Sequence, residues 1–234
     1  MESRTNYSHD MEKSITTGIN MHLSGEQAYN CMASICMSDN VSMPYFSEFL
    51  RLCGVRMRQT AESLIEYQAI RGGQWQLPES MKPLVSVPIM SHNEKDINGL
   101  ICHLIELGLE MERKTEQYLR DLCQVATGKQ DIETVGYIQK SLLRRQRFII
   151  KVMVTHQTGL NLSQNAWLYC NMVIRPFLNQ VKECMRTNSH HFSSHSSTQM
   201  VRNTTNSQSS SDRDNKSMDS ENSIERLFLQ SFSN

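Results

Sequence analysis

The stretch that decides the fold is PYFSEFLRLCGVRMRQTAESLIEYQAIRGG, residues 44–73. Its apolar and small side chains recur at helical spacing over about seven turns, which predicts one long helix with a single buried face. The positions of that face are Phe46, Phe49, Leu50, Cys53, Met57, Ala61, Leu64, Ile65 and Gln68. Pro44 suits the first turn, where a backbone N–H has no partner, and Gly72 with Gly73 supplies a left-handed stop. A helix of this length is typical of a helix bundle.

The helical pattern continues on both sides of this stretch. Apolar side chains at helical spacing predict further long helices over residues 10–37, 94–127 and 132–158. The short loop at 38–43 makes the first two helices antiparallel neighbours. Gly159 interrupts the pattern and is expected to end the fourth long helix. The sequence therefore predicts an all-α protein built as a four-helix bundle.

The connection between the second and third helices is unusually long. Residues 74–93 lose the helical periodicity and contain several prolines. About 20 residues of extended chain can span the length of a long helix, and a long crossover between helices is a known bundle connectivity. A short apolar fifth helix is predicted over residues 166–181, with a kink at Pro176.

Composition and charge exclude several classes of protein. Lys plus Arg equal Asp plus Glu at 24 each, so there is no electrostatic case for nucleic acid or an anionic membrane as partner. No apolar run reaches the ~18 residues of a spanning helix, and the first residues have the pattern of neither a signal nor a transit peptide. The seven cysteines are odd in number and form no CxxC pair, which suits a reducing compartment. We expect a cytoplasmic protein.

The chain changes character after residue 185. Residues 187–223 are rich in Ser, Asn and Thr and nearly devoid of large apolar side chains, so burial cannot offset the entropy lost on ordering. We predict one helical domain, residues 1–185, followed by a disordered tail, residues 186–234. Histidines at 190, 191 and 195 could bind a stray metal, but a flexible polar tail is the simpler interpretation. The last residues, IERLFLQSF, have the pattern of one or two amphipathic turns.

This layout and particular residues resemble the ferritin subunit. The resemblance extends over residues 5–180, and its most specific element is the Arg-Gly-Gly stop at 71–73. The other matching positions include Asn6, Tyr7, Ile15, Ile19, Asn20, Tyr29, Ala61, Glu62, Leu64, Gln68, Lys82, Pro83, Leu109, Glu112, Gln117, Ala126, Thr127, Gln146 and His156. The segment between Leu84 and Ile97 is longer than in the family, and the tail has no counterpart there. The resemblance implies a ferritin-like four-helix bundle with a long crossover between helices two and three and a short fifth helix.

Ferritin heavy chains are ferroxidases that hold two iron ions inside each bundle between carboxylates and one histidine. The resemblance places His22 at the first-helix glutamate, Met57 at the bridging glutamate and Thr60 at the histidine three residues later. Glu112 and Gln146 are retained. A thioether and a hydroxyl replace iron ligands poorly, so His22, Glu112 and Gln146 could hold one metal weakly but not two. We therefore expect ferroxidase activity to be absent or very low.

Two further iron-handling regions of the family are altered. Its cavity-facing carboxylates on the second helix correspond to Arg56, Gln59 and Glu62, so only Glu62 remains as a candidate metal ligand. The acidic residues of its threefold entry channel correspond to Gly136 and Gln139. Without acidic rings, the electrostatic focusing of ferrous ions into a pore disappears.

Three hypotheses for the function remain open. The first, which we favour, is a largely non-catalytic ferritin-like subunit that contributes to intracellular iron storage and binds iron weakly or indirectly. It would enter a homo- or hetero-oligomeric twenty-four-subunit cage beside intact ferritin chains. The second is a structural or interaction protein on a ferritin fold that no longer handles iron. The third is an active iron oxidase with a rearranged site formed by His22, Glu26, Glu112 and Gln146.

Overall fold

The computed structural model describes residues 4–89, 96–194 and 228–232. Its elements are α1 (His9–Met37), α2 (Pro44–Ile70), α3 (Ile97–Gly128), α4 (Ile132–Tyr137), the π-helical segment η1 (Ile138–Leu143), α5 (Arg144–Ser163), α6 (Ala166–Tyr169), the π-helical segment η2 (Cys170–Ile174) and α7 (Arg175–Ser194). The described part contains helices and no strand, so the all-α prediction is confirmed.

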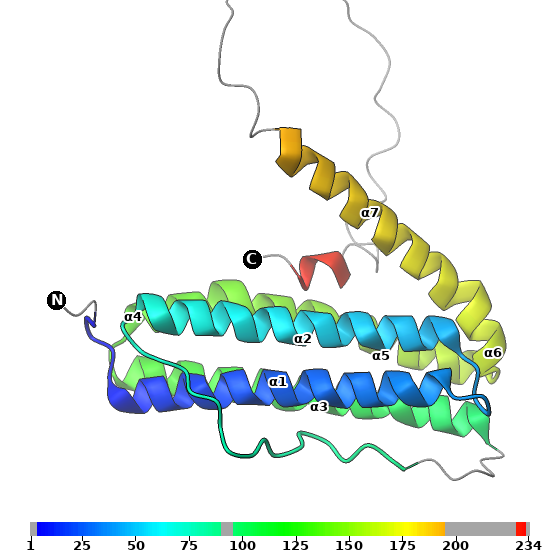
Figure 1. Cartoon of the computed structure of the whole chain (residues 1–234), viewed down its shortest axis with the longest axis horizontal. Coiled ribbons are helices and arrows are strands. Elements are labelled where there is room, and N and C mark those ends of the chain that lie inside the picture. The colour runs from blue at the N-terminus through cyan, green and yellow to red at the C-terminus, as the bar shows by residue number, and fades with distance from the viewer. Residues whose placement is uncertain (1–3, 90–95, 195–227, 233–234) are drawn as a thin grey trace, which may run out of the picture.

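The long helices pack side by side as a bundle. α1 and α2 are neighbours joined by a short loop, and α3 packs against α1 and α5. Residues 71–89 run along the bundle from the end where α2 stops, and α3 begins at the end where α2 begins (Figure 1). A connection of this kind requires a long stretch of non-helical chain. The predicted four-helix bundle with a long central crossover is therefore confirmed.

Side chains and one glycine fix the ends of the long helices. The Ser8 hydroxyl accepts a hydrogen bond from the Met11 N–H at the start of α1, and carboxylates cap α3 and α4 from Asp96 and Asp131. After α2, Gly72 adopts φ 76°, the left-handed conformation that glycine enters without strain. The predicted glycine stop is therefore confirmed.

The prediction that Gly159 ends the fourth long helix is wrong. The helix continues to Ser163, and the chain leaves it at Gln164, whose φ of 50° is left-handed. A Cβ atom on Gly159 would lie 2.6 Å from the hydroxyl oxygen of Tyr169. The glycine allows α6 to approach α5 closely, and this tertiary requirement is invisible in the local pattern.

The fifth helix is longer than the sequence indicated. α6, η2 and α7 follow one another, and α7 ends at Ser194 instead of near residue 181. Pro176 lies in the first turn of α7, directly after the π-helical segment, where the hydrogen-bond pattern changes and its missing N–H is tolerated. α7 turns back diagonally over the bundle (Figure 1) and crosses the boundary predicted at residue 185. Residues 195–227 of the expected tail lie outside the described residues.

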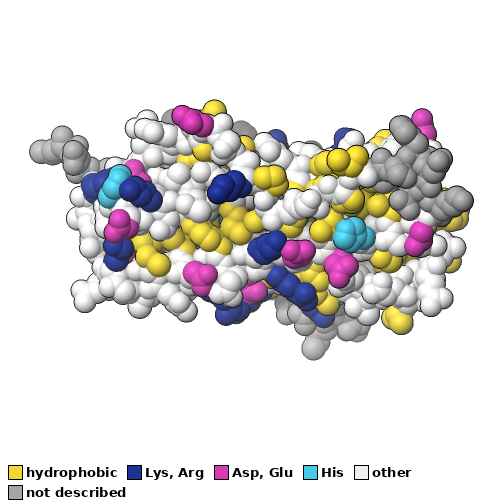
Figure 2. Space-filling view, turned by 90° about the horizontal axis from the view of Figure 1, so that it is seen from below, with side chains coloured by type: hydrophobic (Ala, Val, Ile, Leu, Met, Phe, Trp, Pro, Cys, Tyr) yellow, Lys and Arg dark blue, Asp and Glu magenta, His cyan; other side chains and the backbone are white. Residues whose placement is uncertain are grey.

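The crossover is fastened to α1. The Ser24 hydroxyl donates to the Lys82 carbonyl oxygen at 2.9 Å and accepts from the Leu84 N–H at 3.0 Å. Val85 packs into the core beside it. Figure 2 shows the molecule from below, with hydrophobic side chains in a band along its length and charged side chains bordering them. Of the extra chain indicated between Leu84 and Ile97, residues 90–95 lie outside the described residues.

Arg71 ties the end of α2 to the N-terminal segment and to α4. Its side chain is almost fully buried and donates to the Tyr67 hydroxyl at 2.6 Å, to the Thr134 hydroxyl at 3.0 Å and to the Asp131 carboxylate at 3.1 Å. It also donates to the backbone carbonyl oxygens of residues 5 and 6. A planar guanidinium can make all these bonds at once, so Arg71 is the junction of three segments.

We predict that Arg71→Met lowers the free energy of unfolding by about 3 kcal/mol, because the Asp131 carboxylate is left buried without its cation. The measurement is urea unfolding followed by circular dichroism. Arg58→Met is the control, since the half-exposed Arg58 forms only loose pairs with Glu26 at 3.5 Å and with Glu62 at 3.8 Å, and its loss should cost less than about 1 kcal/mol. Equal losses in the two variants would contradict the junction role of Arg71.

Candidate functional site

A layer of polar side chains lies in the middle of the bundle, between two apolar clusters. One cluster includes Phe46, Phe49, Leu50, Met57, Leu104 and Ile149, and the other includes Met11, Ile15, Ile19, Leu64, Leu119 and Leu142. The buried polar residues between them are His22, Arg56, Thr60, Glu112, Thr115 and Gln146. Each long helix packs against one apolar cluster with one half and against the other cluster with the other half, and its contribution to the polar layer lies between the two.

An ion pair between Arg56 and Glu112 occupies the centre of the layer. Nη2 of Arg56 donates to both carboxylate oxygens of Glu112, at 2.6 and 2.5 Å. The two side chains are 1% and 0% exposed. The Tyr29 hydroxyl donates to the first oxygen at 2.6 Å, and Nε2 of Gln146 donates to the second at 2.6 Å. Both oxygens of Glu112 are therefore engaged by donors from three helices.

Electrostatics keep this ion pair charged. Burial is the largest single effect and works to lower the pKa of Arg56, but the Glu112 charge, Tyr29, Cys53 and the hydrogen bond to Glu112 together outweigh it, so the pKa of the guanidinium is raised. Burial raises the pKa of Tyr29 well above its ordinary value, and the neighbouring carboxylate adds to the effect. Tyr29 is therefore a neutral donor. The centre holds one negative and one positive group in direct contact, as burial of charge requires.

The position of Arg56 corrects an expectation. The resemblance placed it among side chains that face a cavity, whereas it points into the bundle. The signal was present in the sequence, because Phe49, Cys53, Arg56 and Thr60 follow one another at helical spacing on the buried face of α2. An arginine in that phase indicates a buried anion on a facing helix, and Glu112 is that anion.

His22 is a buried, neutral member of the same layer. Its Nδ1 lies 2.8 Å from the Gly18 carbonyl oxygen, which can only accept, so Nδ1 carries the proton. Burial lowers the pKa of His22 to about 4, and the positive charge of Arg56 contributes. Its Nε2 is buried and has no hydrogen-bond partner within the described part of the chain. The imidazole is thus uncharged at neutral pH.

The other candidate ligands lie outside this centre. Glu62 has a side chain that is 60% exposed and lies 3.8 Å from Arg58. Glu26, a member of the rearranged-site hypothesis, also faces Arg58, at 3.5 Å. Met57 and Thr60 are buried, but neither provides a carboxylate or imidazole. Over residues 4–89, 96–194 and 228–232, no three His, Cys, Asp or Glu side chains come together as a metal-binding group.

These residues do not fit a pair of iron ions. A guanidinium already lies against Glu112, and a second cation there would meet its charge at close range. Both Glu112 oxygens accept hydrogen bonds, so metal binding would require Arg56, Tyr29 and Gln146 to give up their contacts. The predicted ligands His22, Glu112 and Gln146 do lie in one layer. The guanidinium of Arg56, however, lies in the same layer and pairs with Glu112.

Comparison with known proteins places the chain in a family. The model of the ferritin-like domain family matches residues 13–162. The chain belongs to the ferritin family. Over 162 residues it is 31% identical to a ferritin middle subunit of Salmo salar, covering 68% of this chain and 86% of that protein. It is 28% identical over 159 residues to soma ferritin of Lymnaea stagnalis, with the same coverage.

Plant relatives are similar over a smaller share of their length. A chloroplastic ferritin of Glycine max is 30% identical over 149 residues, which are 64% of this ferritin-family chain and 56% of the plant protein.

Among the helices that the structure describes, none has the length and apolar character needed to cross a membrane. Helix α7 and the C-terminal segment lie beyond the matched residues.

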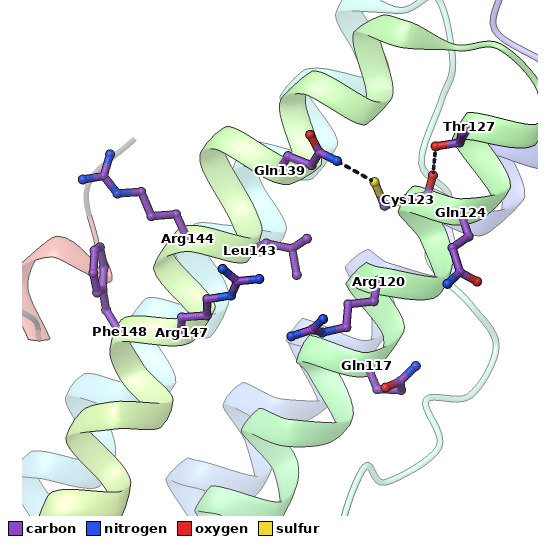
Figure 3. A pocket seen from close by; sticks show the side chains of 10 residues that line it. All are labelled: Gln117, Arg120, Cys123, Gln124, Thr127, Gln139, Leu143, Arg144, Arg147 and Phe148. Carbon is purple, nitrogen blue, oxygen red and sulfur yellow. Dashed lines mark hydrogen bonds between the residues drawn. The ribbon is translucent and has the colours of Figure 1, made fainter.

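A cleft on the outside of this ferritin-family chain includes Gln139, one of the two positions that the resemblance assigns to the family's entry channel. The cleft has a volume of about 1060 Å³, lies between α3 and the η1–α5 helix, and is lined by Gln139 together with Arg120, Arg144 and Arg147. In Figure 3, Arg120 and Arg147 extend toward each other across this cleft. Glu116 pairs with both, at 2.7 and 3.8 Å. These side chains, one carboxylate and three guanidiniums, together carry a net positive charge.

We predict that Arg56→Met lowers the free energy of unfolding by about 3–5 kcal/mol, because it leaves the Glu112 charge buried and unpaired. The double variant Arg56→Met/Glu112→Gln should recover most of that loss, since no charge is left buried. The new amide oxygen can still accept from Tyr29, and Gln146 can turn its own amide oxygen toward the new NH2 group. A double-mutant cycle by guanidinium unfolding measures the coupling between the two residues. Simple additivity of the two single changes would contradict a direct ion pair.

We predict that stability falls as the pH is lowered from about 6.5 to about 4. Burial lowers the pKa of His22 and of His156 from 6.5 to about 4. Between these two pH values the histidines are protonated in the unfolded chain but not in the folded chain. Each histidine then costs roughly 3 kcal/mol by pH 4, and the stability is fully present above pH 6.5.

The test of this pH dependence is the slope of unfolding free energy against pH. His22→Gln should reduce the slope between pH 4 and 6.5 by about one proton. His103→Gln, a change at an exposed histidine, is the control. A His22→Gln variant with the parental slope would show that His22 is not buried in the neutral form.

Proposed function

We propose that this chain is a largely non-catalytic ferritin subunit that contributes to iron storage as part of a mixed shell. The observation that carries the proposal is the buried contact between Arg56 and Glu112. Ferrous iron is the substrate of a ferroxidase centre, and its oxygen ligands must be free to replace water around a hard cation. In this chain the one carboxylate of the central layer is committed to a guanidinium.

The guanidinium fills the electrostatic role that bound cations fill in a metal-binding bundle. A buried carboxylate needs a positive partner to be stable in an apolar interior. Arg56 provides that charge permanently and from within the chain. The folded bundle therefore requires no metal to neutralise Glu112, and it can serve as a shell subunit whether iron is present or not.

We further propose that the chain assembles with intact ferritin subunits in the cytoplasm. Its relative in Salmo salar is named as a ferritin subunit, and the bundle with its crossover is complete over the residues matched to the family. The fifth helix carries exposed apolar side chains at Trp167, Leu168 and Met172, which are 60%, 48% and 69% exposed. Clustered exposed apolar residues are typical of surfaces that bind other chains.

The alternative of an interaction protein that no longer handles iron is favoured by a different observation. α7 and the C-terminal segment fold onto the bundle although they lie outside the residues matched to the family. Assembly separates the two functions, because a closed shell needs self-complementary surfaces that a released bundle does not.

We predict that the chain enters the large shell when it is co-expressed with an intact ferritin heavy chain, and that iron oxidation per shell falls in proportion to its share. Light scattering gives the native mass, and stopped-flow absorbance gives the oxidation rate. An intact heavy chain expressed alone is the reference. A small native mass in both preparations, or undiminished oxidation in mixed shells, would overturn the proposal.

The same oxidation assay can test whether Arg56 prevents the oxidation of ferrous iron. The variant His22→Glu/Met57→Glu/Thr60→His restores the family's ligand types, and the matched variant adds Arg56→Glu. Only the second should oxidise ferrous iron, because in the first Arg56 still holds Glu112. Equal activity in both variants would show that the missing ligands alone prevent oxidation.

A further inference from the structure

The C-terminal segment returns to the bundle. Residues 228–232 form a short turn of helix beside α2, on the side over which α7 passes (Figure 1). Phe228 and Ser231 are fully buried there. The Ser231 hydroxyl donates to the Phe228 carbonyl oxygen, which closes the turn locally. Although it follows a polar stretch of sequence, this segment has side chains that are as buried as those of the bundle core.

Phe228 fills a slot made of aromatic rings from three helices. Its ring centroid lies 5.7 Å from that of Phe49 on α2 and 5.3 Å from that of Phe177 on α7. His156 on α5 packs against both of these rings, 5.1 Å from Phe49 and 4.9 Å from Phe177 in edge-to-face geometry. These separations are those of favourable aromatic pairs. The slot therefore matches one flat apolar ring closely.

A second aromatic residue extends the contact. Phe232 lies four residues after Phe228, on the same side of a helical turn, and the two rings are 5.2 Å apart. Leu229 and Phe232 are partly buried against the same cluster. The segment thus presents two aromatic rings at helical spacing, which is the way a short amphipathic helix anchors in a groove.

We propose that Phe49, His156 and Phe177 form a binding slot for a short helical peptide with aromatic residues four positions apart, and that the chain's own C-terminal segment is its resident ligand. The segment follows α7 in the chain, with residues 195–227 between them. Because ligand and slot belong to one chain, this linkage sets the effective concentration of the segment at the slot. Two phenylalanines bury far less apolar surface than a bundle helix, so the segment can exchange. This inference does not rest on the proposed role in iron storage.

The peptide of residues 224–234, IERLFLQSFSN, provides the direct test. The full chain with Phe228→Ala/Phe232→Ala has an open slot and should bind the fluorescently labelled peptide saturably, measured by anisotropy without iron. The same peptide carrying Phe228→Ala should bind at least tenfold more weakly. The unaltered chain should also bind the peptide at least tenfold more weakly, because its own segment occupies the slot.

Slot variants complete the test. In the open-slot chain, Phe177→Ala should abolish peptide binding, and the milder Phe177→Leu should weaken it if the alanine variant fails to fold. Phe148→Ala, which changes a phenylalanine lining the cleft between α3 and α5, is the matched control and should leave binding unchanged. Absence of saturable binding to the open-slot chain, or equal binding of the Phe228→Ala peptide, would overturn the proposal. A native mass that falls when Phe228 is replaced would assign the segment to a second copy and overturn the resident-ligand assignment.

Discussion

The structure depends on the placement of one charged pair at the centre of an apolar bundle. Removing Arg56 and Glu112 from water costs several kcal/mol for each ion, by order of magnitude, and only close contact with full hydrogen bonding offsets it. Tyr29 and Gln146 complete the hydrogen bonding of the Glu112 carboxylate from α1 and α5, whereas Nε of Arg56 has no partner within the described part of the chain. Four helices are thereby fixed in register at one level, because a shift along any helix axis would separate a buried charge from its partners.

The same pair explains why the loss of iron ligands is compatible with a stable fold. A centre that retained its carboxylates without metal would carry unbalanced buried negative charge. In this chain Met57 and Thr60 are neutral, Glu112 is the remaining carboxylate of the layer, and Arg56 balances it. Charge is matched one to one. His22 adds no charge, because burial keeps its imidazole neutral. The polar layer is thus self-sufficient.

Much of the architecture was predictable because it follows from local pattern. Apolar spacing located the four long helices, and the glycine after α2 located its stop. The errors share one cause: the deciding contact comes from a different helix. Gly159 is required by Tyr169, not by a helix end. Arg56 turns inward because Glu112 lies on a facing helix. The aromatic spacing of Phe228 and Phe232 was visible, but its slot is formed by three helices and could not be inferred from a polar tail.

The buried ion pair and the arginine-lined cleft lie in different parts of the chain. Arg56 and Glu112 are in the interior of the bundle, whereas Arg120 and Arg147 line the cleft between α3 and α5. If the chain enters a mixed shell as proposed, it would have two effects. It would contribute no oxidation centre, and it would supply the uncharged Gly136 and Gln139 at the positions that the resemblance assigns to the acidic channel. The field of a narrow opening is the sum over the chains that form it. Each added copy would thus lower ferrous entry for its intact neighbours as well as for itself.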